Sequence, residues 1–149
     1  MSDTQGNTSS NTTWHFWVIG IAALLWNCLG ALDYVMTQTQ NEEYMSQYTP
    51  EQLEYFYAFP AWLVADWAIA VWGGVLGAIL LLAKKQLAVP VFLVSLIAMV
   101  ISVLYTYGIS NGMEVVGDAF SLVFTAVIFL IALALFLYAR RMRERGVLT

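Results

Sequence analysis

The sequence predicts an all-α integral membrane protein, an antiparallel bundle of four transmembrane helices. Of its 149 residues, 60% are hydrophobic and 11% are charged, whereas soluble domains carry about a quarter charged residues. The hydrophobic residues fall into four blocks of roughly twenty, the length that crosses a bilayer core of about 30 Å. All six basic residues lie in two clusters, after the second and fourth blocks. This composition excludes a soluble enzyme, a disordered protein and a disulfide-rich secreted module.

Polar residues bound each hydrophobic block. Residues 1–13 are mostly Ser, Thr, Asn and Gln, so we expect a disordered polar tail. Residues 14–139 form the membrane domain, and residues 140–149 form a basic tail. Because the connections are short, neighbouring helices should run in opposite directions. The predicted helices span residues 14–36, 59–83, 87–109 and 118–138.

The first loop on the acidic side contains a predicted amphipathic helix. Thr49, Pro50 and Gln52 have the residue types of an N-cap, a first helical residue and a capping-box partner. The helix should therefore run from Pro50 toward Tyr57. Its hydrophobic residues recur at helical spacing, so one face of it is expected to lie on the membrane surface.

The basic residues predict the orientation of the chain. Basic residues close to helix ends remain on the cytoplasmic side, and an antiparallel arrangement places both basic clusters on one side. Both termini are therefore expected to be cytoplasmic, with the two acidic loops on the outside. The residues that set this topology are Lys84, Lys85, Arg140, Arg141, Arg143 and Arg145.

Small residues form a stripe on each predicted helix, as close packing inside a membrane requires. Gly30 belongs to the stripe of the first helix, and Gly73 and Gly77 form a GxxxG pattern on the second. This pattern is typical of helix packing, either within one chain or across a dimer. The strong charge asymmetry makes a parallel homo-oligomer the expected form of any dimer.

Asp66 is the most informative polar residue, because a carboxylate within a transmembrane helix costs a few kcal/mol unless it is protonated, paired or hydrated. Two interpretations remain open. Asp66 is either a protonatable site in an outward-facing cavity or a structural acid hydrogen-bonded to Asn27, a tyrosine or a tryptophan. In the first interpretation the stripes supply a path for a solute or proton, lined by Asp66, Asn27, Ser102, Thr106 and Thr125.

Several other chemistries lack sequence support. Cys28 is the single cysteine and His15 the single histidine, so neither a disulfide within the chain nor a bis-histidine haem site is available. We expect no metal site and no cofactor. The sequence contains no nucleophile–base motif, phosphate-binding loop or HExxH, so enzyme function is not predicted. Nucleic-acid binding is not expected either, because the basic residues adjoin hydrophobic blocks.

Several stretches together resemble a family of small, mostly uncharacterised bacterial inner-membrane proteins, some of which are labelled "sugar transporter". The resemblance covers nearly the whole chain after the polar tail, and it implies four transmembrane helices and an inner-membrane location. It transfers no catalytic or binding residue. The stretches that carry it are Trp14-His15-Phe16-Trp17, Tyr44-Met45-Ser46-Gln47, Thr49-Pro50-Glu51-Gln52-Leu53, Phe59-Pro60-Ala61-Trp62, Trp72-Gly73-Gly74-Val75-Leu76-Gly77 and Ala88-Val89-Pro90-Val91-Phe92.

Two functional hypotheses follow from the sequence. The first is a small-solute permease for a sugar-like molecule, linked to protons through Asp66. The second is a non-catalytic accessory or scaffold subunit that packs against a larger membrane complex. The intramembrane acid without a basic partner favours the first hypothesis. The glycines, which admit a partner helix, favour the second.

Overall fold

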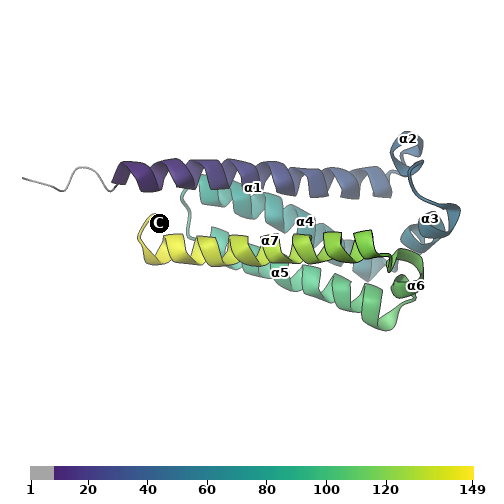
Figure 1. Cartoon of the computed structure of the whole chain (residues 1–149). Helices are drawn as coiled ribbons and strands as arrows, with labels where there is room; N and C mark the ends of the chain where they lie inside the picture. Colours follow the sequence, from purple (N-terminus) through teal and green to yellow (C-terminus); the bar gives the residue numbers. More distant parts are fainter. Residues whose placement is uncertain (1–8) are drawn as a thin grey trace, which may run out of the picture.

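The computed structural model describes residues 9–149, and in this range the chain folds into helices connected by short turns (Figure 1). Four of the helices are long and apolar enough to cross a membrane, which confirms the all-helical prediction. They are α1 (Ser9–Gln38), α4 (Ala61–Leu82), α5 (Ala88–Leu104) together with the π-helix that continues it to Ile109, and α7 (Ala119–Glu144).

Two of these helices are longer than the sequence predicts. Helix α1 begins at Ser9, five residues before the predicted start, and its 30 residues extend over about 45 Å. The rest of the predicted polar tail, residues 1–8, lies outside the described part of the chain. Helix α7 continues past the predicted end at Tyr138 to Glu144. Once a helix has formed, adding a residue at its end costs little free energy, because each added residue forms a further backbone hydrogen bond. Polar residues at either end can therefore continue the helix.

Three short helices connect the long ones at one end. The predicted helix at Pro50 is confirmed as α3 (Pro50–Tyr57), and Thr49 and Gln52 form the expected capping box. Helices α2 (Glu42–Met45) and α6 (Gly112–Val116) lie where the sequence predicts only loops. Helix α5 passes directly into a π-helix, η1 (Tyr105–Ile109), so the predicted third helix ends in a wider turn.

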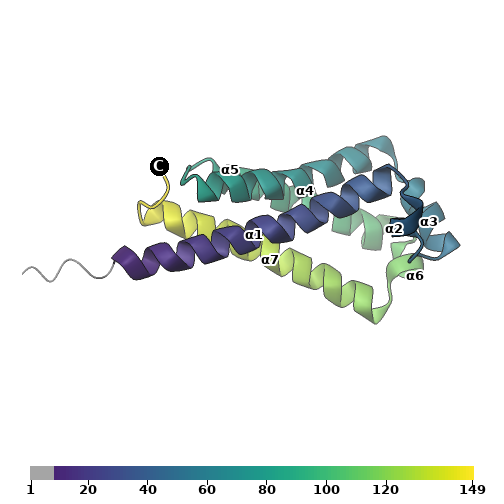
Figure 2. The same cartoon turned by 90° about the horizontal axis from the view of Figure 1, so that it is seen from above.

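The two ends of the structure differ in composition. We call the end formed by α2, α3 and α6 the loop end, and the opposite end, which carries Lys84, Lys85 and the arginines of α7, the basic end. Helix α4 packs on both α1 and α5, and α5 also packs on α7. Figure 2 shows that α1 and α7 cross in their basic halves and diverge toward the loop end.

The hydrophobic core lies near the basic end. It joins the first half of α1 and the first turns of α5 to the last turns of α4 and α7, and it also includes Leu148, which is 1% exposed. The basic end is therefore the tightly packed half of the molecule. The core consists of Phe16, Ala23, Ala78, Leu81, Ala88, Val89, Phe92, Leu135, Ala139, Met142 and Leu148.

Two glycines of α4 let this helix approach α5 closely. A Cβ atom added at Gly77 would lie 2.7 Å from two ring carbons of Phe92, and one at Gly73 would lie 3.1 Å from Ser95 Cβ. Gly30 lies farther from its neighbour, because its added Cβ would be 3.8 Å from Val71 Cγ1. The GxxxG pair therefore packs against α5 of the same chain.

The contact at Gly77 predicts a stability effect. Phe92 is 3% exposed, so its ring has no room to move away from a larger side chain. Gly77→Leu should therefore lower the free energy of unfolding in detergent by about 1–3 kcal/mol through overpacking. Gly108→Leu is the matched control, since a Cβ there meets nothing within 4 Å. Equal stability of the two variants would contradict this packing.

Candidate functional site

The side chain of Asp66 lies in the second turn of α4 and is half-buried. Ser102 of α5 donates a hydrogen bond from Oγ to Asp66 Oδ2 over 2.6 Å. The sequence suggested Asn27 or an aromatic side chain as the hydrogen-bond partner of Asp66, whereas in the structure the partner is Ser102 of the neighbouring helix α5. This bond joins α4 to α5 in the half of the structure nearer the loop end.

Three further polar contacts surround the end of α5. The hydroxyl groups of Tyr107 and Thr125 lie 3.3 Å apart, linking η1 to α7. Ser110 Oγ donates to the carbonyl oxygen of Thr106 over 3.0 Å and lies 2.7 Å from the hydroxyl of Tyr55 on α3. Thr106 therefore takes part through its backbone, and the predicted residues Ser102, Thr106 and Thr125 all lie toward the loop end.

The π-helix positions these groups. In η1 the amide of Ser110 donates to the carbonyl of Tyr105 over 2.8 Å, five residues back instead of the four of an α-helix. This wider turn is rare and is often found at functional sites. It allows consecutive residues to reach different neighbours, Tyr107 toward α7 and Ser110 toward α3. The sequence offers no clear signal for it.

Asn27 lies apart from this group. Its side-chain amide donates to the carbonyl of Ala23 in its own helix over 2.8 Å, and its side chain packs against Gly74 of α4. Gly74 and Asp66 are eight residues apart on α4, a separation of about 12 Å along the helix axis. The five residues predicted to line one path therefore fall into two groups, and Asn27 stands alone in the middle of the structure.

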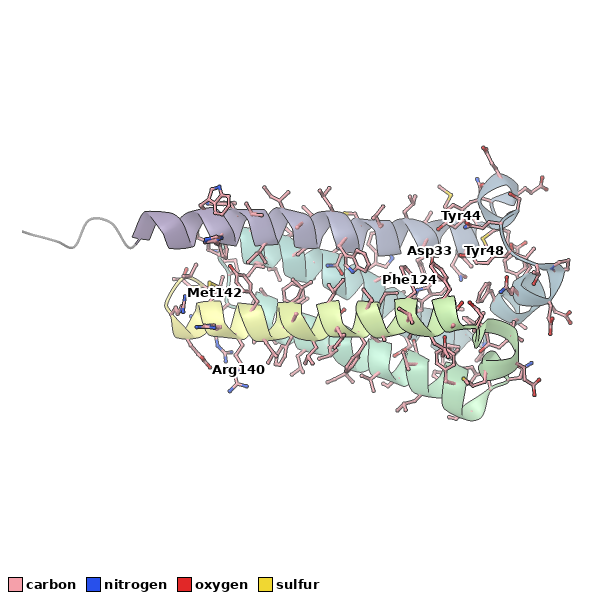
Figure 3. All side chains as sticks on the ribbon, viewed as in Figure 1. Asp33, Tyr44, Tyr48, Phe124, Arg140 and Met142 are labelled. Carbon is pink, nitrogen blue, oxygen red and sulfur yellow. The ribbon has the colours of Figure 1, made fainter. Side chains whose placement is uncertain are left out.

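An acidic and aromatic cluster at the end of α1 was not predicted. The hydroxyl of Tyr44 donates to Asp33 Oδ1 over 2.7 Å, and Tyr48 lies nearby (Figure 3). Burial and the neighbouring Asp33 carboxylate raise the pKa of both Tyr44 and Tyr48 above the usual value. Both phenols therefore stay protonated at neutral pH, and Tyr44 holds α2 against α1.

Asp118 lies at the start of α7. It forms the N-cap of α7, where it accepts hydrogen bonds from the side chain and the backbone amide of Ser121 over 2.7 and 3.0 Å. These hydrogen bonds lower the pKa of the Asp118 carboxyl. Its role in the fold is therefore to start α7.

Two surface hollows of about 300 Å³ each lie elsewhere. One is an apolar groove between α1 and α4, and the other lies between the end of α1, α2 and α3. Asp66 borders neither of them. The apolar groove is lined by Cys28, Ala31, Leu32, Val35, Trp72 and Val75, and the second hollow by Gln40, Glu42, Met45, Ser46, Leu53 and Tyr57.

Charge is separated along the long axis. Within residues 9–149 every Lys and Arg lies at the basic end, where Lys84 Nζ is 5.8 Å from the Trp17 ring and Arg140 pairs with Glu144 over 3.3 Å. Both partners of that ion pair are exposed, so its contribution to stability is small. The same range contains no group of three or more His, Cys, Asp or Glu side chains that could hold a metal ion.

Comparison with known protein families, with curated proteins and with solved structures gives no match for this chain. The arrangement of its own residues is therefore the basis for a functional assignment.

The bond between Ser102 and Asp66 predicts a measurable difference between two substitutions. Ser102→Ala removes the donor and leaves a half-buried carboxyl oxygen without its partner, so the free energy of unfolding should fall by about 1–3 kcal/mol. Ser121→Ala is the control, because Ser121 donates its hydroxyl to the exposed Asp118. The comparison uses denaturant titration in detergent. An equal loss in both variants would contradict a special role for the Asp66 contact.

Proposed function

We propose that this chain is a multi-pass protein of a bacterial inner membrane, with its basic end in the cytoplasm and its loop end outside. The four apolar helices support insertion, and the positive-inside rule supports the orientation. The long axis then crosses the bilayer, and the acidic loops with α2, α3 and α6 face the outer solution.

Within the membrane we propose a small-solute permease whose loop end receives the solute. The observation that carries this proposal is the uneven distribution of polar and apolar groups. The hydrophobic core closes the basic end, whereas Asp66, Ser102, Tyr107 and Thr125 form hydrogen bonds in the other half, where α1 and α7 diverge. The resemblance to proteins labelled as sugar transporters makes a sugar-like solute the proposed substrate class.

Asp66 is the proposed proton-linked group of this permease. No Lys or Arg of the described residues lies at the loop end to hold it ionised, and Ser102 can donate to the carboxyl in either protonation state. A charged carboxylate costs more free energy in an apolar medium than a neutral carboxyl group does. Proton exchange at Asp66 would therefore bias the packing of α4 against α5, which carries the Ser102 donor.

A second candidate function is that of an accessory subunit, and one feature of α7 favours it. Phe120, Val123 and Leu130 of α7 are 77%, 63% and 60% exposed. These apolar side chains meet lipid in a single chain, but they would also suit a neighbouring helix of a parallel homo-oligomer or of a larger membrane complex.

The orientation predicts the behaviour of fusion proteins. Alkaline phosphatase is active only outside the cytoplasm, so a fusion after Thr149 should be inactive and a fusion near Gln47, in the turn after α2, should be active. The same two positions fused to a cytoplasmic fluorescent reporter provide the reciprocal control. Phosphatase activity after Thr149 but not near Gln47 would contradict the orientation.

The permease proposal predicts the effect of Asp66→Asn. This substitution preserves the shape and an acceptor for Ser102 but removes the proton exchange. In proteoliposomes the variant should insert and fold as the parent does, yet lose the acceleration of sugar uptake by a proton gradient. Asp118→Asn, at an exposed helix cap, should retain it.

Two outcomes would decide against the proposal. Uptake with an unchanged response to the gradient in Asp66→Asn would contradict the proton-linked role of this residue. No uptake by the parent protein, together with recovery of a stable membrane complex that survives Asp66→Asn, would contradict the permease and support the accessory subunit.

A further inference from the structure

The last residues of the chain pack into the core of the basic end. Helix α7 closes with a Schellman motif, in which Gly146 adopts φ +76° and the amides of Gly146 and Val147 donate to the carbonyls of Arg143 and Met142 over 3.0 and 2.9 Å. This motif reverses the chain direction. Leu148 then enters the core, where it is 1% exposed.

A second contact fixes the same segment to the turn between α4 and α5. The amide of Thr149 donates to the carbonyl of Lys84 over 2.9 Å. Lys84 itself adopts φ +57°, and its ammonium lies 5.8 Å from the ring of Trp17 on α1. The end of the chain, the α4–α5 turn and α1 therefore meet at Lys84, as Figure 1 shows for the C-terminus and this turn.

Two close helix contacts of α4 lie near the middle of the structure. Gly73 meets Ser95 of α5 and Gly74 meets Asn27 of α1. Small residues at a contact let the helix backbones approach each other closely. On one side of this level lies the closed core, and on the other side α1 and α7 diverge (Figure 2).

We propose that residues 146–149 form a latch that holds the basic end closed while the loop end is splayed. Release of Leu148 from the core would let the helices rock about the contacts of Gly73 and Gly74, which opens the basic end and closes the loop end. The solute would then be exposed to each side in turn, as alternating access requires. This inference rests on the proposed permease function and adds the device that controls its inward-facing side.

Cysteine labelling at both ends tests the latch. In a Cys28→Ser background, one reporter is Ala139→Cys, at a core position that is 0% exposed. The other is Thr125→Cys, in the loop half of α7. A membrane-impermeant maleimide is applied to proteoliposomes from the basic side for the first reporter and from the loop side for the second. No solute is present.

The latch predicts opposite changes at the two reporters. Leu148→Ala weakens the closed state, so labelling at position 139 should become about tenfold faster and labelling at position 125 about threefold slower. Leu148→Met fills a similar volume and should behave as the parent. Gly146→Ala is the second variant if Leu148→Ala fails to fold. Its Cβ meets nothing within 4 Å, so it perturbs only the φ +76° backbone of the motif.

Each of the other results overturns either the latch or the permease proposal. Faster labelling at position 139 with no change at position 125 would show a clamp that stabilises one end without coupling to the other. Unchanged labelling at position 139 would show that Leu148 does not hold the basic end closed. Opposite changes at the two ends without any solute uptake would overturn the permease proposal and leave the latch in place. Solute uptake without opposite labelling changes would overturn the latch and leave the permease proposal in place.

Discussion

The hydrophobic core at the basic end is the constraint on which the rest of the structure depends. Apolar side chains of α1, α4, α5 and α7 meet there, and Leu148 completes the cluster. In the membrane location proposed above, lipid is as apolar as these side chains, so close packing rather than the hydrophobic effect would hold the helices together. Toward the loop end α1 and α7 separate, and hydrogen-bonded polar groups accompany aromatic contacts such as that between Tyr34 and Trp67.

Helix α4 is the element that connects the two halves. Its glycines bring α5 and α1 close at the middle and at the basic end, whereas its Asp66 bonds to Ser102 of α5 in the loop half. In the proposed permease, a change in the charge of Asp66 would act on two of the four helices that form the core of the basic end. This shared pair of helices would link proton exchange at Asp66 to opening of the basic end.

Hydrophobic blocks, caps and glycine spacing were enough to predict most of the fold. The four long helices and the capped helix at Pro50 follow from block length and from the Thr49–Gln52 capping box. The π-helix at the end of α5 could not be predicted, because it depends on which neighbours its side chains reach. The burial of Leu148 was missed as well, although Gly146 after an Arg-rich last turn is a recognisable signal for a Schellman motif.

The candidate site was predicted less completely. Asp66 is conspicuous in an apolar block, but its partner Ser102 is 36 residues away, and sequence spacing does not reveal pairs on different helices. Asn27 looked equivalent to the other polar stripe residues, yet it lies opposite Gly74 in the middle of the structure. The Asp33–Tyr44 bond depends on the placement of α2, a four-residue helix without a periodic pattern.

The central claim is that the same four helices are closed at the basic end and splayed at the loop end. Distances between spin labels on α1 and α7, measured by pulsed electron resonance in lipid nanodiscs, test it most directly. One pair joins Val18 to Leu137 near the basic end, and the other joins Val35 to Phe120 near the loop end. We expect a short, narrow distance distribution for the first pair and a longer, broader one for the second. Equal, narrow distributions at both ends would contradict it.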